Sequence, residues 1–438
     1  MVADISRAPL EFCREKLGII FHYSKQNRYS FHALIGAFEI NLNLIDIPIF
    51  LSSREMFFQD LDRLFSVDGF NKLIVGFSIN SFQINYFKKL IENLNSHPRR
   101  DDFIIIVGGP HPSALPKNLL DIGADIVVIG EGEKSFPELI TLIRNNEQLS
   151  QQKGIAFKTN AQKFCLQPKN DLVDLNNYPP FAPKRGLYSA IEITRGCKFG
   201  CKYCQVPSLF GKTIRYRNPD NVIKWGEYLL SKRPHWDFRF ISTNAFGYYS
   251  KRSDNPNVKK IQELLSGLKK LKAKKSKRIF FGTFPSEVRP ESITDDTLNL
   301  TKEFCDNTNL TMGAQSGSQK ILGIIKRGHS VEQIHNAVDL ALKYGFQLNI
   351  DFILGFPEET PEDQYATLEL CKELIAKKCK IHMHYLIPLP GTAYENKIPR
   401  ELDPEVFTIL GRWSKKGLIF GSWDHQYNTV KNRLKIRK

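Results

Sequence analysis

The chain has 438 residues and a formal net charge of +16; 42% of its residues are hydrophobic and 25% are charged. This length exceeds one ordinary hydrophobic core, so two or three domains are expected. The composition excludes collagen-like and wholly disordered chains, and apolar runs such as residues 103–107 are far shorter than the ~18 residues that a membrane helix requires. Residues 1–12 lack the basic and apolar segments of an export signal, so we expect a cytoplasmic protein.

The first domain is predicted to span residues 1–145. Between Leu17 and Leu142, apolar segments such as "KLIVGFS" and "FIIIVGG" alternate with amphipathic segments such as "INYFKKLIENL". Apolar strands separated by amphipathic helices are typical of a doubly wound, Rossmann-like parallel sheet in an α/β domain. Two strands are followed by pairs of glycines, where a ligand can approach the backbone closely: Gly108 with Gly109, and Gly130 with Gly132.

A second α/β domain follows a linker. Residues 146–187 are polar and irregular, with a candidate hairpin, and are interpreted as that linker. Residues 188–390 contain six candidate strands, each followed by a turn and most by a helix, which predicts an open, partial (βα)6 barrel of the TIM type. The functional site of such a fold lies at the carboxyl ends of the strands. Residues 391–438 form a C-terminal extension that either covers the barrel mouth or completes its packing.

The segment "TRGCKFGCKYCQ" after the first barrel strand contains Cys197, Cys201 and Cys204. A structural zinc site takes four ligands, usually as two pairs, and no second pair is present. A redox dithiol would use Cys201 and Cys204 and leave Cys197 unexplained. Three thiolates on one turn suit a 4Fe-4S cluster, in which each binds one iron and the fourth iron stays open for another ligand. Lys198, Lys202 and Arg195 either offset the negative charge of this cluster or are plain surface charges.

This CxxxCxxC spacing, with Tyr203 before the last cysteine, resembles the radical S-adenosylmethionine (radical SAM) superfamily. The resemblance implies that the open iron binds S-adenosylmethionine and that an electron from the cluster cleaves it to a 5′-deoxyadenosyl radical. It also implies an electron donor such as a reductase, ferredoxin or flavodoxin. Carboxylates at strand ends can accept bonds from ribose hydroxyls, and an arginine can pair with the methionyl carboxylate. The matching segments nominate Tyr203, Thr243, Asn244, Glu287, Gln315, Ser316, Arg327 and Asp351, although the sequence departs from the glycine-rich pattern at Thr243 and Asn244.

The segments "FIIIVGGPHPSALP" and "ADIVVIGEGEKSFPEL" resemble the cobalamin-binding domain that precedes one branch of radical SAM enzymes. A domain that binds no cofactor is the alternative. The chain lacks the DxHxxG loop that supplies a histidine ligand to cobalt in other cobalamin proteins, because His22 has neither the aspartate nor the glycine. We therefore expect no protein histidine on the lower cobalt face. The resemblance nominates Ser78, Gly108, Gly109, His111, Gly130, Glu131 and Gly132 as cobalamin-binding residues.

Together these resemblances favour a cobalamin-dependent radical SAM methyltransferase that methylates an unactivated carbon through radical hydrogen abstraction and transfer from methylcobalamin. The alternative is ring formation, ring contraction or rearrangement without methyl transfer. A methylthiotransferase is less favoured, because that branch needs three more amino-terminal cysteines and only Cys13 and Cys165 precede the triplet. A cobalamin-sensing or redox-sensing module would leave the nominated barrel residues without a purpose.

The sequence assigns neither a catalytic residue nor a substrate. A protein or peptide is compatible, and the basic charge is compatible with an acidic macromolecule. The densest basic block, residues 269–278, is interpreted as the solvated outer face of a helix, while contact of this block with a partner stays open.

Overall fold

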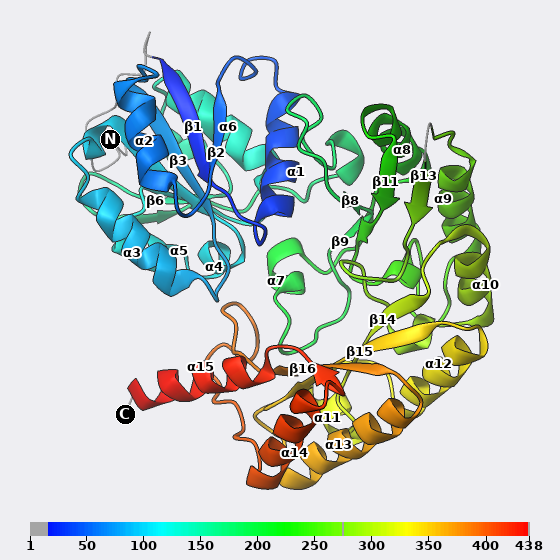
Figure 1. Cartoon of the computed structure of the whole chain (residues 1–438). Coiled ribbons are helices and arrows are strands. Elements are labelled where there is room, and N and C mark those ends of the chain that lie inside the picture. The colour runs from blue at the N-terminus through cyan, green and yellow to red at the C-terminus, as the bar shows by residue number, and fades with distance from the viewer. Residues whose placement is uncertain (1–15, 274–275, 437–438) are drawn as a thin grey trace. The chain divides into compact units, whose positions relative to one another are not determined.

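The structure is a computed structural model that describes residues 16–273 and 276–436 (Figure 1). It divides into two compact units. The first unit runs to Ser189 and includes residues 208–210, and the second holds Ala190–Pro207 and the chain from Gly211 onward. Within the described ranges, no helix combines the length and apolar character needed to cross a bilayer.

The first unit is built on a seven-stranded sheet in the order β2-β1-β3-β4-β5-β6-β7. Strands β1 to β5 are parallel, and β6 and β7 form an antiparallel hairpin that continues the sheet beyond β5. This hairpin lies in the segment that the sequence analysis interprets as a linker. The strands are β1 (Leu17–His22), β2 (Ile49–Ser52), β3 (Lys72–Ser78), β4 (Phe103–Gly108), β5 (Ile126–Val128), β6 (Ile155–Lys158) and β7 (Phe164–Leu166).

Helices cover both faces of this sheet, because successive strand residues point to opposite sides. Ile20, Val75 and Ile105 pack with α2, α3 and α5, whereas Ile19 and Ile74 pack with α1 and α6. Two separate apolar cores result, as a doubly wound fold requires. The helices are α1 (Arg28–Glu39), α2 (Phe57–Ser66), α3 (Ile84–Asn95), α4 (Pro110–Ala114), α5 (Pro116–Ile122) and α6 (Gly132–Arg144).

The second unit is a partial barrel of parallel strands. Parallel pairs join β8 to β12, β11 to β13, and β14 through β15 and β16 to β17. Single parallel bridges connect the segment after β12 to the segment after β13, through Ser242 and Ser286, and that segment to β14, through Val288 and Met312. The strands are β8 (Ile191–Glu192), β9 (Thr194–Arg195), β10 (Arg215–Tyr216), β11 (His235–Phe238), β12 (Phe240–Ile241), β13 (Ser276–Ile279), β14 (Asn309–Gln315), β15 (Gln347–Leu354), β16 (Lys380–Tyr385) and β17 (Ile419–Phe420).

Helices α8, α9, α10, α12 and α13 lie along the outer side of these strands (Figure 1). Ser330 and Gln333 form a reciprocal capping box at the start of α12, and Thr360 with Asp363 does the same for α13, so local sequence sets both helix starts. The helices are α7 (Val206–Phe210), α8 (Pro219–Lys232), α9 (Val258–Lys270), α10 (Asp295–Phe304), α11 (Gln319–Ile324), α12 (Val331–Lys343), α13 (Pro361–Ala376), α14 (Pro404–Lys415) and α15 (Trp423–Ile436).

Two segments bear on the sequence interpretation. The C-terminal extension adds β17 to the sheet beside β16, and Trp423 at the start of α15 is buried against Phe407. The extension therefore takes part in barrel packing. The interpretation of residues 269–278 as one helix face is wrong, because α9 ends at Lys270 and residues 276–279 form β13; residues 274 and 275 lie outside the described ranges.

Candidate active site

The cysteine triplet lies on the loop that follows β9. Backbone hydrogen bonds shape this loop: the Cys197 N–H donates to the Gly211 carbonyl at 3.2 Å, and the Cys204 N–H donates to the Cys201 carbonyl at 3.1 Å. All three cysteines are free thiols, with Cys201 buried and the other two half-buried. Burial raises the pKa of Cys197, and it raises the pKa of Cys204 to about 11, with the neighbouring cysteines adding to both shifts.

These properties fit an iron-sulfur cluster. The raised pKa values of Cys197 and Cys204 disfavour their deprotonation, and a bound metal is the usual means of holding such groups as thiolates. With three cysteines converging, one iron of a 4Fe-4S cluster would have no protein thiolate.

Two arginines provide the positive charge beside the thiols. Arg327 places Nη1 4.0 Å from the Cys201 Sγ. Arg289 is buried, and its guanidinium lies 3.6 Å from the centroid of the Phe199 ring, inside the cysteine loop. Arg289 also donates to Glu291 at 2.5 Å and to the Arg327 carbonyl.

Sequence reasoning missed Arg289, although it lies two positions after the nominated Glu287 on the same segment. It assigned the charge balance to three other cations as one of two alternatives. Arg195 instead pairs with Glu192 at 2.6 Å, and Lys202 lies 3.6 Å from Glu358. The Lys198 ammonium donates to the Lys251 carbonyl at 2.7 Å.

Four nominated residues gather at the ends of the neighbouring strands. A Cβ built on Gly313 of β14 would lie 2.6 Å from the Gln315 Nε2, 2.7 Å from the Arg327 Nη2 and 3.3 Å from the Glu287 Oε2, so glycine leaves room where these groups converge. Burial and the adjacent Asp351 carboxylate raise the pKa of Glu287 to about 7, while Arg327 opposes the shift. Near neutral pH the Glu287 carboxyl group is therefore partly protonated.

The other nominated barrel residues make bonds within the loops. The Thr243 Oγ1 donates to the Gly196 carbonyl at 3.3 Å, and the Asn244 Oδ1 accepts from the Arg289 N–H at 3.3 Å. Ser316 is fully buried, and its hydroxyl accepts from the Ser318 N–H at 3.1 Å. Burial raises the pKa of Tyr203.

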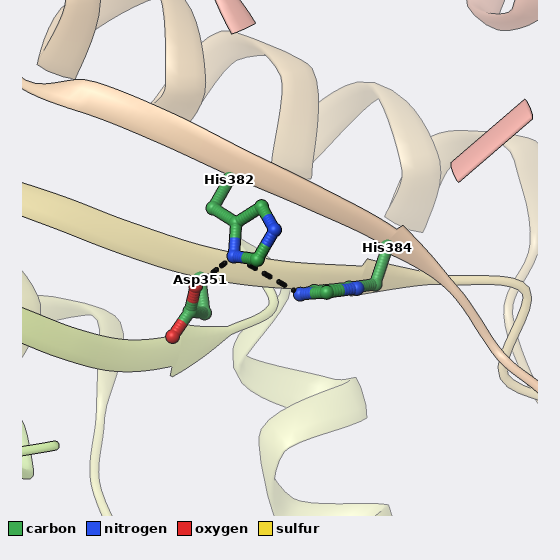
Figure 2. Close-up of side chains that lie close together, drawn as sticks. All are labelled: Asp351, His382 and His384. Atoms are coloured by element: carbon green, nitrogen blue, oxygen red, sulfur yellow. Dashed lines mark hydrogen bonds and ion pairs between the residues drawn. The ribbon is translucent and has the colours of Figure 1, made fainter. Parts of the chain in front are cut away.

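Asp351 extends the polar cluster to two histidines that sequence reasoning missed (Figure 2). The Asp351 Oδ1 lies 2.7 Å from the His382 Nδ1, which lies 3.2 Å from the His384 Nε2. The signal in the sequence was the HxH spacing in a predicted strand, because alternate strand residues share a face.

In the first unit, the nominated cobalamin residues lie at the carboxyl edge of β3, β4 and β5. Ser78 and Gly108 are cross-strand partners at the ends of β3 and β4. Gly109 has φ +99°, and a Cβ there would lie 2.9 Å from backbone atoms of Ile79, so a side chain does not fit. A Cβ on Gly108 or Gly130 would meet no described atom closer than 3.7 Å. This open, small-residue edge fits a large ligand that approaches the backbone.

Three further nominated residues flank this edge. The His111 Nδ1 lies 3.0 Å from the Ser81 Oγ, and the Glu131 Oε2 accepts from the Val173 N–H at 3.2 Å. Gly132 begins α6.

His22, the histidine without a DxHxxG loop, ends β1 and is buried in the core of the first unit. Its Nε2 lies 2.8 Å from the Tyr86 hydroxyl, and its ring packs 5.1 Å from that of Phe87. Burial lowers the pKa of this imidazole.

Comparison with protein families assigns both units. Residues 191–371 match the radical SAM superfamily, and residues 56–140 match the B12 binding domain. The chain thus contains a B12-binding domain followed by a radical SAM domain, which confirms the predicted fold class. It also confirms the predicted cofactors, since the first family uses a 4Fe-4S cluster with S-adenosylmethionine and the second uses cobalamin.

Particular proteins resemble this chain over long stretches. A putative methylthiotransferase of Methanocaldococcus jannaschii is 29% identical over 289 residues, which are 64% of this chain and 60% of that protein. The cobalamin-dependent S-adenosylmethionine radical enzyme OxsB, solved with aqua-cobalamin and S-adenosylmethionine, superposes with a TM-score of 0.65 at 16% identity, covering 92% of this chain and 56% of that one. The radical S-adenosylmethionine methyltransferase TsrM from Kitasatospora setae gives a TM-score of 0.65 at 15% identity, covering 87% and 77%. At these identities the solved structures share the fold, and the chain spans less than two thirds of the length of the first two proteins.

Proposed function

We propose that this protein is a cobalamin-dependent radical SAM methyltransferase that acts on an unactivated carbon. The observation that carries the proposal is the position of Arg327, which reaches the Cys201 Sγ with Nη1 and donates to the Gly313 carbonyl with Nη2 at 2.7 Å. Arg327 thereby joins the cysteine loop to the site where Glu287 and Gln315 converge. S-adenosylmethionine has a carboxylate at one end and ribose hydroxyls at the other, and the residues between the cysteine loop and Glu287 offer hydrogen-bond partners to both ends.

Each group of residues has a proposed task. Cys197, Cys201 and Cys204 hold the cluster, and Arg327 pairs with the methionyl carboxylate. Glu287 and Asp351 accept hydrogen bonds from the ribose. When bound, the cluster and S-adenosylmethionine supply a 5′-deoxyadenosyl radical, and cobalamin supplies the methyl group.

Further side chains of the barrel complete this pocket in the proposal. Gln315 offers its amide to the adenosine, and Tyr203 shields the cluster from water. Thr243, Asn244 and Ser316 keep the surrounding loops in place through the bonds described above.

The cobalamin site is proposed at the carboxyl edge of the first unit. Gly108, Gly109 and Gly130 admit the ligand to the backbone, and Gly132 opens α6 beside them. Ser78, His111 and Glu131 add polar groups. Because His22 is enclosed by aromatic rings, we propose that no protein histidine binds cobalt.

Radical SAM enzymes need a reductant, so the proposed partner is a reductase, ferredoxin or flavodoxin in the cytoplasm. For the substrate we propose a protein or peptide with acidic character, which a chain of net charge +16 attracts.

Methylthio transfer is a second candidate because the Methanocaldococcus jannaschii relative bears that name. The cysteine inventory disfavours it. Cys13 lies outside the described residues, and the other cysteines beyond the triplet are scattered, with Cys371 and Cys379 buried. Ring formation or rearrangement without methyl transfer uses the same cofactors, so only an experiment distinguishes it from methyl transfer.

The decisive experiment gives methyl-labelled S-adenosylmethionine and a strong reductant to the anaerobically reconstituted protein with candidate substrates. Methyl transfer predicts near-equal amounts of 5′-deoxyadenosine and S-adenosylhomocysteine, and one labelled methyl in the product. Consumption of a true substrate with 5′-deoxyadenosine but no label would replace the proposal with rearrangement or cyclisation. A gain of sulfur with the label would establish methylthio transfer.

The cluster assignment has its own control. Replacing Cys197, Cys201 and Cys204 by alanine should abolish cluster incorporation, whereas Cys305→Ala should retain it, because Cys305 lies at the end of α10, outside the cysteine loop. Cluster content that survives in the triple variant would show that the ligands are wrong.

A further inference from the structure

We propose that the Asp351 Oδ1, His382 and His384 form a binding site for a divalent first-row transition-metal ion, separate from the cluster cysteines, while the Asp351 Oδ2 stays available for the proposed bond to the ribose. One ligand atom from each residue lies within 4.8 Å of the other two. The proposal does not depend on methyl transfer.

Strand geometry brings the three side chains together. His382 and His384 alternate along β16 and therefore project from the same face. Asp351 of β15 is the direct cross-strand partner of His382. Figure 2 shows the carboxylate and both imidazoles meeting on that face.

The atomic contacts are difficult to satisfy with protons alone. The His382 Nδ1 lies 2.7 Å from the Asp351 Oδ1 and 3.2 Å from the His384 Nε2. A ring nitrogen has one in-plane position, which carries either a proton or a lone pair, so it cannot make two well-aligned bonds. One cation between the three atoms would accept one lone pair from each of them.

The spacing is close to that of metal ligands. Bonds of about 2.0–2.2 Å to a tetrahedral ion place neighbouring ligand atoms about 3.4 Å apart. The 3.2 Å between the histidine nitrogens is near this value. The Asp351 Oδ1 is 2.7 Å from the His382 Nδ1 and has to withdraw by about 0.7 Å, which a small side-chain rotation provides.

Residues of the C-terminal extension hold the two imidazoles. The Phe420 ring stacks on His382 with centroids 4.5 Å apart and planes 9° apart. The Gln426 Oε1 accepts from the Tyr385 N–H at 2.8 Å, and its Nε2 lies 3.4 Å from the His384 Nδ1. Such outer contacts orient metal-binding histidines.

Gln426 also supplies a specific prediction. Binding an ion through the His384 Nε2 moves that ring's proton to Nδ1, where it faces the amide NH2 of Gln426. A carboxylate at this position would accept the proton and still accept from the Tyr385 N–H. Gln426→Glu should therefore strengthen binding, although it leaves all three ligands unchanged.

The donor set selects the class of ion. Two imidazoles and one carboxylate suit Zn²⁺, Fe²⁺ or Co²⁺, whereas Mg²⁺ and Ca²⁺ prefer oxygen ligands. Three protein ligands leave at least one coordination position open. The two histidines are half-buried, so an oxygen or nitrogen atom of a substrate can reach that position.

The test measures Zn²⁺ uptake by the full-length, cluster-containing protein, by equilibrium dialysis and elemental analysis after chelator treatment. Wild type should bind about one Zn²⁺ per chain. His382→Gln/His384→Gln should weaken binding by about 100-fold or more, while Gln426→Glu should tighten it by about tenfold. His335→Gln is the matched control, since that histidine lies on α12 with its side chain 35% exposed and should leave uptake unchanged.

Equal uptake by wild type and the double histidine variant would overturn the proposal, as would no uptake by wild type. Circular dichroism and iron content report whether the double variant is folded. If it is not, Gln426→Glu decides, because an affinity equal to that of wild type would then refute the site. No readout uses S-adenosylmethionine, so a failed zinc site and a failed methyltransferase assignment remain distinguishable.

Discussion

Glu359 should make the barrel less stable as pH rises. This residue follows β15, is 2% exposed, and accepts from the Gly355 N–H at 2.7 Å. Burial raises its pKa from 4.5 to about 8, with a smaller contribution from Asp363. A carboxyl group with a raised folded-state pKa favours the folded state fully below 4.5, and this contribution is lost as pH rises to about 8.

The magnitude follows from the width of this pH window. Each pH unit between the two pKa values costs the folded state about 1.4 kcal/mol, so the whole window corresponds to about 5 kcal/mol. Glu359→Gln removes the ionisation and keeps an oxygen for the Gly355 N–H. The variant should therefore be as stable as wild type, or slightly less stable, near pH 5. Near pH 8 it should be more stable by several kcal/mol, on the order of 3.

Hydrogen exchange measured by mass spectrometry provides the assay, because it reports the local opening of β15 and α13 without requiring the whole chain to unfold in one step. Wild type and variant are compared at each pH, which cancels the intrinsic pH dependence of exchange. A difference in opening free energy that stays constant from pH 5 to pH 8 would refute the burial argument. Glu362→Gln, in the exposed first turn of α13, is the matched control.

Three further predictions follow. Arg289→Gln should lower the cluster reduction potential by about 60 mV, since it removes a cation beside the thiolates; a redox titration followed by electron paramagnetic resonance measures this, and Arg289→Lys should recover most of the shift. His32→Gln should reduce the loss of stability of the first unit between pH 6.5 and 4. Burial lowers the pKa of His32 to about 4, so protonation of this imidazole below its ordinary pKa of 6.5 opposes folding. If denaturation shows that the stabilities of variant and wild type fall equally over this pH range, the prediction is contradicted. Gly109→Ala should destabilise the first unit by roughly 1–3 kcal/mol and weaken cobalamin uptake, whereas Gly411→Ala, whose Cβ would meet nothing within 4 Å, should have little effect.

The sequence was sufficient where chemistry and local structure coincide. The cysteine spacing predicted that three thiols lie together on one loop, as they do, and the Ser330–Gln333 capping box located the start of α12. The polar residues at predicted strand ends identified the residues that gather around Glu287, because the carboxyl ends of parallel strands lie at the same edge. These features can be predicted from the sequence because each depends only on neighbouring residues or on the known periodicity of helices and strands.

Other features depend on packing between distant segments. Arg289 reaches Phe199 across a separation in sequence that no local pattern records. The pairing of Asp351 with His382 follows from the register of β15 and β16, which becomes known only when the strands are paired. The basic block at residues 269–278 looked like one helix face because composition does not reveal where α9 stops and β13 begins.

The pairing of β17 with β16 has a consequence for the order in which the molecule is completed during synthesis. Phe420 and Gln426 contact the two histidines from beyond α14, so a ribosome exposes β16 long before it produces these neighbours. Until β17 has been made, the edge of β16 that pairs with it has no strand partner, and until Gln426 has been made His384 lacks this neighbour. A nascent chain that ends before Ile419 should therefore contain strands β8 to β16 but lack the contacts that fix the histidine pair, and it should leave this edge of β16 unpaired.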